Sequence, residues 1–193
     1  MNTPSHAIVN YALLSGMAPR QLWPIVVGAV LPDFPMLVLV IWAKVQGIGG
    51  AKLWGEVYWQ PFWQDFTHYF HSIPIALAVA IAAHFLGVNW LKYLAISMVL
   101  HSIGDLPLHH DDAHRHFLPF SQFKFISPVS YWDRNHNAVW GALAENVAVL
   151  ASIGYLFPAI ELWWVKGALM LLNGLAWIAY LLFFLRPYLG PLA

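Results

Sequence analysis

Long apolar stretches that contain almost no charged residues limit what this chain can fold into. Hydrophobic residues fill 60% of its 193 positions and charged residues 9%, against roughly 45–50% and about 25% in soluble domains. Nine Lys and Arg balance nine Asp and Glu, so the net charge is zero with His neutral. This composition excludes a disordered chain and a surface that coats nucleic acid. We therefore predict an all-α, polytopic membrane helical bundle that forms one domain over residues 1–193.

The apolar periodicity predicts six helical segments separated by polar ones. The second helical segment is broken near Pro32–Pro35, because two prolines three residues apart end one helix and begin another. Pro74 is expected to bend the third segment. Residues 47–60 are predicted to form a polar loop, and residues 105–134 a polar, His-rich irregular loop. The predicted helical segments are residues 5–16, 22–42, 65–86, 93–103, 138–157 and 163–185.

Ionisable residues interrupt these apolar segments, where a charge is expensive and usually faces the protein interior with a partner. His101 and Asp105 are four residues apart, which places both on one face of a helix, about 5–6 Å apart at Cβ. His68 and His71 share a helix face in the same way. Asp33 lies at the predicted helix break, where a bend can aim it inward. These positions predict a buried polar site built from several helices.

Imidazole nitrogens and carboxylate oxygens without thiolates form a ligand set for zinc, manganese, iron or nickel. The chain has ten His and no Cys. Together with His6 on the first helix, the candidate ligands outnumber the roughly four that one structural zinc takes. This surplus permits a centre of two or three metals, and such centres activate water and hold phosphate oxygens.

Several of these residues also have simpler interpretations. Asp33 is a favoured N-cap residue for the helix that follows the break. His101 and Asp105 can form a buried pair that fixes helix packing. His84 alone is more often a satisfied polar residue than a ligand. Some loop histidines can simply be solvated, namely His109, His110 and His116.

Two other classes of membrane protein also stay open. His71 and His84 are 13 residues apart, as are His101 and His114, and bis-His haem proteins use similar spacings on transmembrane helices. Pro107 counts against a single helix from His101 to His114. The broken second helix also resembles the discontinuous helices of carriers. A metal or small-solute transporter or binding protein is therefore the main alternative, and a b-type haem protein the lesser one.

The order of the motifs resembles that of a known family. Ser5-His6, Leu31-Pro32-Asp33, His71-Ser72 and His101-x3-Asp105 follow one another as in the membrane-bound metal-dependent hydrolases, a bacterial family described as LexA-regulated. The polar segment over residues 110–133 is also similar to a subgroup of these inner-membrane proteins. The resemblance implies a multi-pass protein of the bacterial inner membrane whose metal ligands are His6, Asp33, His71, His101 and Asp105.

A more distant similarity is to zinc-dependent phospholipases C and single-strand-specific zinc nucleases. Those enzymes hold three zinc ions with His and Asp residues in the same order. They also use a processed N-terminal Trp, where this chain has Met1. They carry a second His-x3-Asp or His-x3-Glu motif, whereas His136 is followed at that spacing by Trp140. These departures leave the third metal open.

The resemblance and the residues together predict a membrane-embedded metal-dependent hydrolase that uses metal-activated water on a phosphoester or lipid substrate. The expected cofactor is one to three divalent ions, zinc before manganese or iron. The lipid bilayer is the expected surrounding; no nucleic-acid partner is expected, and the sequence indicates no protein partner. The expected metal ligands are His6, Asp33, His68, His71, His101, Asp105, His109 and His110. The expected catalytic residues are Asp112, His114 and Arg115.

Overall fold

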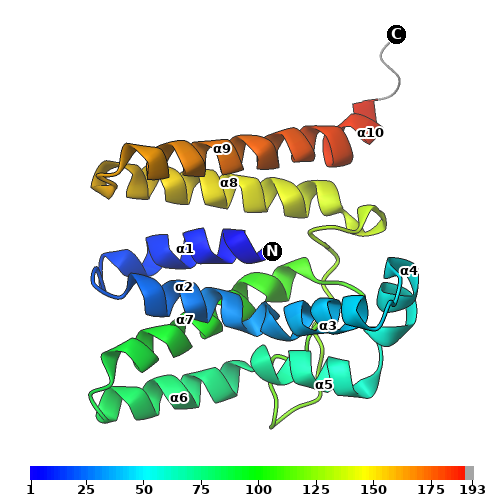
Figure 1. Ribbon diagram of the computed structural model, residues 1–193, viewed down its shortest axis with the longest axis horizontal. Coiled ribbons are helices and arrows are strands. Elements are labelled where there is room, and N and C mark those ends of the chain that lie inside the picture. The colour runs from blue at the N-terminus through cyan, green and yellow to red at the C-terminus, as the bar shows by residue number, and fades with distance from the viewer. Residues whose placement is uncertain (190–193) are drawn as a thin grey trace.

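The computed structural model describes residues 1–189, and every regular element in that range is a helix, as predicted. The last four residues of the predicted domain, 190–193, lie outside the described residues. The helices pack side by side with their long axes nearly aligned, in the spatial order α9, α8, α1, α2, α7, α6 (Figure 1). Their bounds are α1 Thr3–Ser15, α2 Leu22–Val30, α3 Phe34–Val45, α4 Gly50–Lys52, α5 Pro61–Phe70, α6 Ile73–Phe85, α7 Asn89–Asp105, α8 Ala138–Leu156, α9 Trp163–Ala179 and α10 Arg186–Leu189.

Four helical segments are long and apolar enough to cross a membrane, which is compatible with a multi-pass membrane protein. Their lengths of 22 to 25 residues correspond to about 33–38 Å of helix, against a hydrocarbon thickness of about 30 Å. Large apolar side chains remain exposed along them, as on Leu37, Ile41 and Leu171. The four segments are Leu22–Val45, Pro61–Phe85, Ala138–Ala159 and Trp163–Leu185.

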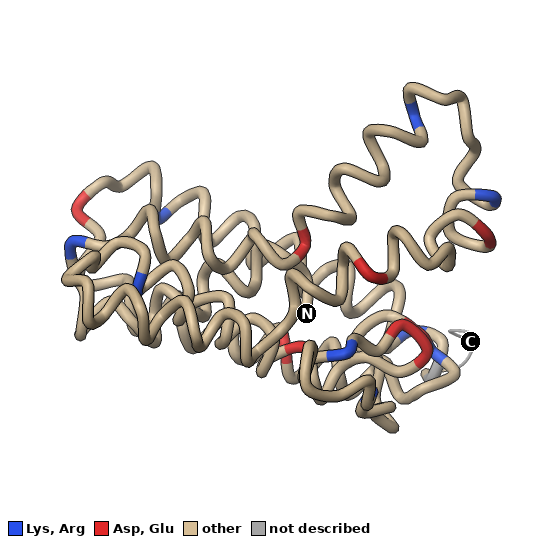
Figure 2. The backbone as a smooth tube through the Cα atoms, turned by 90° about the horizontal axis from the view of Figure 1, so that it is seen from below, with Lys and Arg blue, Asp and Glu red and all other residues tan. Residues whose placement is uncertain are grey.

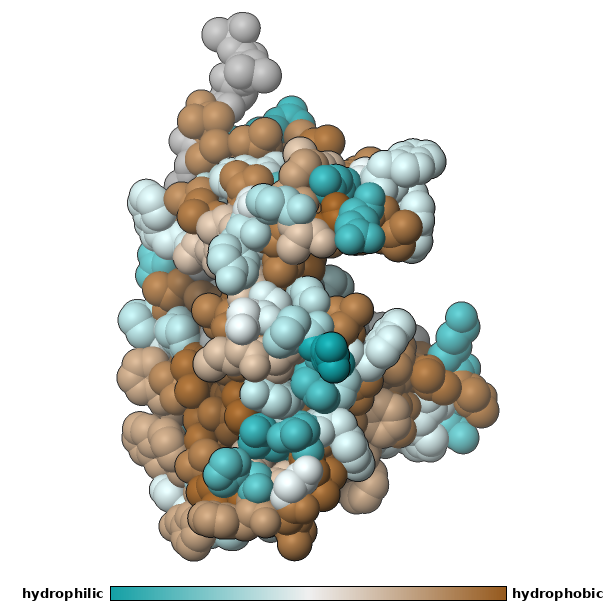
Figure 3. Space-filling view, turned by 90° about the vertical axis from the view of Figure 1, so that its left-hand side faces the viewer, coloured by the Kyte–Doolittle hydropathy of each residue, from teal (hydrophilic) through white to brown (hydrophobic). Residues whose placement is uncertain are grey.

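The polar and charged residues are distributed as a membrane bundle requires. Basic residues lie mostly toward the two ends of the molecule, whereas acidic residues also lie beside the N-terminus at its middle (Figure 2). At the end of the bundle where the helix turns gather, hydrophilic side chains collect in the centre of the face and hydrophobic ones cover its flanks (Figure 3). The charges near the middle therefore need partners within the protein.

The predicted break in the second helical segment is confirmed. A single 3₁₀ turn, Leu31–Asp33, joins α2 to α3. Pro32 and Pro35 lie in the first turns of the 3₁₀ and α-helical segments, where a missing N–H costs little. Asp33 occupies the N-cap position of α3, but its side chain makes no capping hydrogen bond. The carboxylate is therefore available to the interior of the bundle, and the capping interpretation is wrong.

The segment expected to be one bent helix over residues 65–86 consists of two helices, α5 and α6. Proline lacks an N–H, and its ring clashes with the carbonyl four residues earlier. In agreement, α5 ends at Phe70, four residues before Pro74. Ser72 begins α6 as a true N-cap, since its hydroxyl oxygen accepts a hydrogen bond from the Ile75 N–H at 3.2 Å. The break places His71 between the two helices.

The prediction of a loop over residues 47–60 is wrong in part. This region contains α4 and a π-helical turn, Leu53–Val57. Leu53 and Val57 are buried against Leu39 of α3 and Trp63 of α5, so packing on a hydrophobic cluster favours helical turns despite the polar composition. The predicted irregular loop after α7 is confirmed, apart from short 3₁₀ turns at its two ends.

Chain breaks meet near half the length of the bundle (Figure 1). The turn at Leu31–Asp33 lies near the middle of the Leu22–Val45 span, and His71 lies near the middle of the Pro61–Phe85 span. At the same depth α1 begins and α7 ends, close to the N-terminus in Figure 1. The loop after α7 occupies the space beyond these half-length helices. Polar side chains from five chain segments are thereby brought together inside an apolar bundle.

Close packing of α2 on α7 depends on Gly28. A Cβ atom added there would lie 2.1 Å from the carbonyl oxygen of Leu94, a backbone atom that cannot move aside without shifting α7. We expect Gly28→Ala to lower the free energy of unfolding by about 1–3 kcal/mol, measured by thermal unfolding in detergent. Gly154→Ala on the exposed face of α8, where the added Cβ meets nothing within 4 Å, serves as the control. Equal stability of the two variants would contradict the packing.

Candidate metal centre

The centre of the polar site is the carboxylate of Asp105, the last residue of α7, which is 1% exposed. Its Oδ2 atom lies 3.0 Å from Nε2 of His101 and 3.6 Å from Nε2 of His71. Its Oδ1 atom lies 2.9 Å from Nε2 of His6 and 3.3 Å from Nε2 of His109. The two oxygens of one buried carboxylate therefore face two different sets of histidines.

The first set forms a group of four candidate ligands with Asp33. One ligating atom from each of Asp33, His71, His101 and Asp105 lies within 4.8 Å of all the others. Oδ1 of Asp33 is 3.7 Å from Nε2 of His71 and 3.6 Å from Nε2 of His101. The hydroxyl of Thr3 donates a hydrogen bond to the other Asp33 oxygen. The two helix breaks and the end of α7 thus supply one compact set of nitrogen and oxygen ligands.

The second group consists of Asp105, His109 and His114, again with one ligating atom each within 4.8 Å of the others. His109 and His114 come from the loop that follows α7 and are 6% and 4% exposed. Asp112, between them in sequence, lies 3.1 Å from Nδ1 of His109 through its Oδ2 atom. The two groups of candidate ligands share Asp105, so they adjoin each other at one carboxylate.

Contacts around the ligands orient the imidazole rings. The Nδ1–H groups of His71 and His101 donate to the backbone carbonyls of Thr67 at 2.8 Å and Ala29 at 2.7 Å. Each ring then presents the lone pair of Nε2 to the centre, the arrangement that metal-ligating histidines adopt. Nε2 of His71, His101 and His109 and Nδ1 of His114 are buried without a hydrogen-bond partner. Buried polar atoms rarely remain unpaired, so these residues can hold a metal ion.

His6 and the N-terminus complete the surroundings of Asp105. The ring of His6 stacks on His101 with centroids 3.7 Å apart, and the amino group of Met1 lies 2.6 Å from Oδ1 of Asp105. Glu145 on α8 accepts hydrogen bonds from the Asn2 side chain at 2.8 Å and from Ser5 at 2.5 Å, which ties the start of α1 in place. No motif in the sequence indicated the contact between Met1 and Asp105.

Two further histidines lie just outside the ligand groups. Nδ1 of His68 accepts the backbone N–H of Arg115 at 3.5 Å, and its ring lies edge-on to His114. The Nδ1–H of His116 donates to the carbonyl oxygen of His71 at 3.2 Å. His116 is 2% exposed and His109 6%, so both are buried rather than solvated. The density of histidines in this loop was the signal that could have pointed to His116.

The charge states of the loop residues follow from burial and from their neighbours. Burial, with the nearby His71, lowers the pKa of His116 to about 4, and the same causes hold the pKa of His114 well below its usual range. Burial opposes a charge on His109 as well, but Asp105 and Asp112 outweigh it and raise its pKa. Although burial alone would raise it, the pKa of Asp112 is lowered by His109. Neutral His114 and ionised Asp112 are thus both favoured near pH 7.

Of the expected metal ligands, His6, His68 and His110 belong to neither ligand group, and the side chain of the expected catalytic residue Arg115 is also directed elsewhere. The guanidinium of Arg115 pairs with Asp65 and Gln122. His110, although next to His109 in sequence, belongs to a separate group with Asp111 and His136.

The geometry also bears on the haem alternative. His84 lies on an exposed face of α6, 13 residues from His71, or about 20 Å along helical chain. His71 lies beside both His101 and His114, with ring centroids 5.1 and 4.0 Å away. A porphyrin between His101 and His114 would collide with His71. Neither predicted His pair therefore provides a bis-His haem site in this fold.

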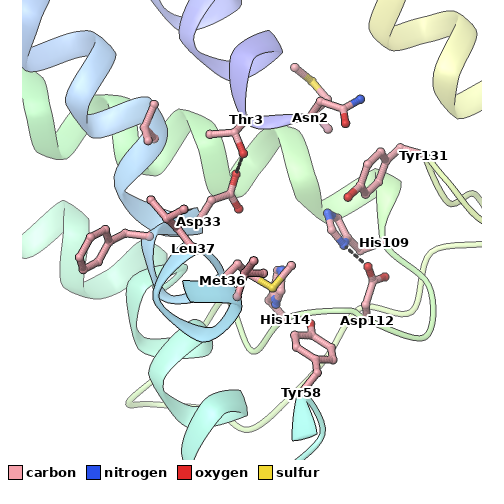
Figure 4. Close-up of a pocket in the computed structure, with 14 residues that line it drawn as sticks. Asn2, Thr3, Asp33, Met36, Leu37, Tyr58, His109, Asp112, His114 and Tyr131 are labelled. Atoms are coloured by element: carbon pink, nitrogen blue, oxygen red, sulfur yellow. Dashed lines mark hydrogen bonds and ion pairs between the residues drawn. The ribbon is translucent and has the colours of Figure 1, made fainter. Parts of the chain in front are cut away.

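A cavity of about 390 Å³ opens beside the two ligand groups. In Figure 4, Asp33, Thr3 and Leu37 lie on one side of it and His109 and Asp112 on the other, with Met36 extending between them. Its other polar lining includes the phenols of Tyr58 and Tyr131, which no sequence motif indicated. No Lys or Arg within residues 1–189 lines this cavity.

No protein-family model, curated protein or solved structure matches this chain. The resemblance to membrane-bound metal-dependent hydrolases therefore stays a prediction from scattered motifs, and the geometry of the centre has to support any function on its own.

A shared carboxylate makes metal retention sensitive to Asp105. We expect Asp105→Asn to lower zinc retention in both ligand groups, because an amide is a far poorer metal ligand than a carboxylate. Bound metal per chain, measured after purification in detergent, checks this. Glu161→Gln changes an exposed carboxylate in the turn between α8 and α9 and should retain the wild-type metal content. Full zinc retention in Asp105→Asn would contradict the assignment.

Metal affinity should also rise with pH. His109 must lose a proton to bind a metal, and Asp105 and Asp112 raise its pKa, so protons compete most strongly on the acid side of that pKa. Asp112→Asn removes one of these charges and should shift the midpoint of the pH dependence to lower pH. Competition with a zinc-binding dye between about pH 5 and about pH 8 measures both effects. Affinity that increases toward acid pH would contradict the ligand set.

Proposed function

We propose that this chain is a membrane-embedded metal-dependent hydrolase that cleaves a phosphoester, with a lipid as the preferred substrate class. The observation that carries the proposal is the Asp105 carboxylate, shared by two groups of buried ligands at the wall of a cavity. Two-metal sites of this kind lower the pKa of water and stabilise both the attacking and the leaving oxygen of a phosphoester.

Zinc is the proposed metal, with one ion in each group. Imidazole and carboxylate ligands suit zinc, with manganese and iron as weaker alternatives. Asp33, His71 and His101 would hold one ion, and His109 and His114 the other, with Asp105 between them. The ligands of the first ion come from two helix breaks and the last turn of α7, and those of the second come from the loop that follows α7.

Asp112 is the proposed proton acceptor. It lines the cavity and contacts His109 through Oδ2, and the same oxygen accepts a hydrogen bond from the indole N–H of Trp132 at 3.0 Å. Its lowered pKa keeps it ionised near pH 7, as a general base requires. Burial raises the pKa of Tyr58 to about 12 and raises that of Tyr131. Both phenols therefore keep their protons and can donate hydrogen bonds to a substrate oxygen.

The lining of the cavity supports a lipid substrate. Phe34, Leu37 and Val40 line it and are also 42%, 54% and 38% exposed on the membrane-facing side of α3. An acyl chain can lie along this apolar wall while the phosphate reaches the ligand groups. Because no Lys or Arg of the described chain lines the cavity, the bound metals would carry the positive charge that the phosphate requires. We place the protein in the bacterial inner membrane, with the bilayer as its only proposed partner.

A metal transporter is the second candidate. The observation that favours it is the position of the ligands at two helix breaks near mid-span, where carriers bind their ions. Uptake of zinc into sealed vesicles that contain the protein distinguishes transport from hydrolysis.

Hydrolysis by the zinc-loaded protein tests the proposal. Bis-p-nitrophenyl phosphate and a phospholipid in mixed micelles serve as substrates, and released product is measured. We expect Asp112→Asn to lower kcat by about 100-fold or more while bound zinc is retained. His84→Ala, on the exposed face of α6, should leave kcat unchanged. Absence of hydrolysis of every phosphoester, together with zinc uptake into vesicles, would favour the transporter instead.

A further inference from the structure

A separate group of ligating side chains lies where the loop after α7 begins and ends. One ligating atom from each of His110, Asp111 and His136 lies within 4.8 Å of the others. The rings of His110 and His136 stack with centroids 3.5 Å apart and planes 18° apart. None of these residues belongs to either group that contains Asp105.

The side chains of the neighbouring His109 and His110 point to different sites because the backbone at His109 is extended. His109 has extended dihedral angles, φ −118° and ψ 129°, and successive side chains of an extended strand point to opposite sides. His109 points to the buried centre and is 6% exposed. The side chain of His110 is 24% exposed and that of Asp111 65%, so this second location is reachable from solvent.

The imidazole rings are held as metal ligands are. Nδ1 of His110 is 2.5 Å from the carbonyl oxygen of Ser127, and Nδ1 of His136 is 2.7 Å from Oδ2 of Asp133. Both acceptors require a proton on Nδ1, which leaves the lone pair of each Nε2 free. Nε2 of His110 lies 3.4 Å from Oδ1 of Asp111. The Nε2 lone pairs and a carboxylate oxygen are thus free, and one ligating atom of each residue lies within 4.8 Å of the others. Binding of one ion would turn the two stacked rings until their lone pairs converge on it.

Backbone hydrogen bonds already hold the two ends of the loop together. The Ser127 N–H donates to the His109 carbonyl at 3.0 Å, and the Ser130 N–H donates to the His136 carbonyl at 2.7 Å. The ligands therefore lie close together before any metal binds, which lowers the entropic cost of binding.

We propose that His110, Asp111 and His136 bind a further metal ion, a zinc-class divalent cation that clasps the loop 109–136. Two imidazoles select transition metals over calcium or magnesium, and three protein ligands leave a position for water. The clasp lies outside the proposed catalytic centre. It fixes the loop that supplies His109, Asp112 and His114 to that centre.

Zinc stoichiometry in matched variants of the full-length protein tests the clasp. We expect Asp105→Asn to retain one solvent-accessible zinc, and the Asp105→Asn/His136→Gln double variant to lose it. Asp111→Asn, a change at an exposed side chain that folding tolerates, should weaken the same zinc in the Asp105→Asn background. Glu56→Gln in that background removes an exposed carboxylate elsewhere and should change nothing.

A second readout is the rate of proteolysis within the loop. Zinc should slow cleavage of Asp105→Asn between residues 110 and 136, and the His136→Gln change should abolish that protection. Equal zinc content and equal cleavage rates with and without His136→Gln would overturn the proposal, whether or not the chain hydrolyses phosphoesters.

Discussion

A carboxylate buried inside an apolar bundle is stable only when other groups meet its charge, and the arrangement around Asp105 follows from that requirement. An unpaired buried charge costs several kcal/mol or more. Asp105 is 1% exposed, and its charge is met by the amino group of Met1 and by Nε2 of His6. The Nε2 atoms of His101 and His109 also face it, at 3.0 and 3.3 Å. These four groups come from three parts of the chain, so the carboxylate connects the start of α1, the end of α7 and the loop beyond it.

The arrangement of the helices brings the groups around Asp105 together near half the length of the bundle. Membrane helices satisfy their backbone groups internally, and breaks are tolerated where other protein groups replace the lost hydrogen bonds. Here the break at Leu31–Asp33 and the gap at His71–Ser72 both face the end of α7. The short helices and the helix breaks therefore position the candidate ligands. The adjoining cavity has polar residues on one wall and, on another, apolar residues that reach the exposed face of α3.

Local patterns in the sequence predicted part of this arrangement. The four-residue spacing of His101 and Asp105 by itself predicts that they share one face of a helix. In the structure both residues lie on α7. The meeting of Asp33 with His71 is expected because both interrupt apolar segments and because the family resemblance names both as ligands. No local pattern in the sequence predicts that the side chains of His109 and His110 point in opposite directions. Their directions depend on the extended backbone after α7 and on contacts with residues up to 26 positions away. The partners of loop residues are set by such long-range packing, which spacing does not encode.

Zinc K-edge X-ray absorption of the zinc-loaded His136→Gln variant tests most directly whether Asp105 joins two metal sites. The variant removes the outer clasp, so the spectrum reports only the buried centre. A shared Asp105 predicts nitrogen and oxygen neighbours around zinc, and a second zinc about 3.5–4 Å away. A zinc that has no zinc neighbour at full loading, or a buried centre that binds no zinc at all, would contradict it.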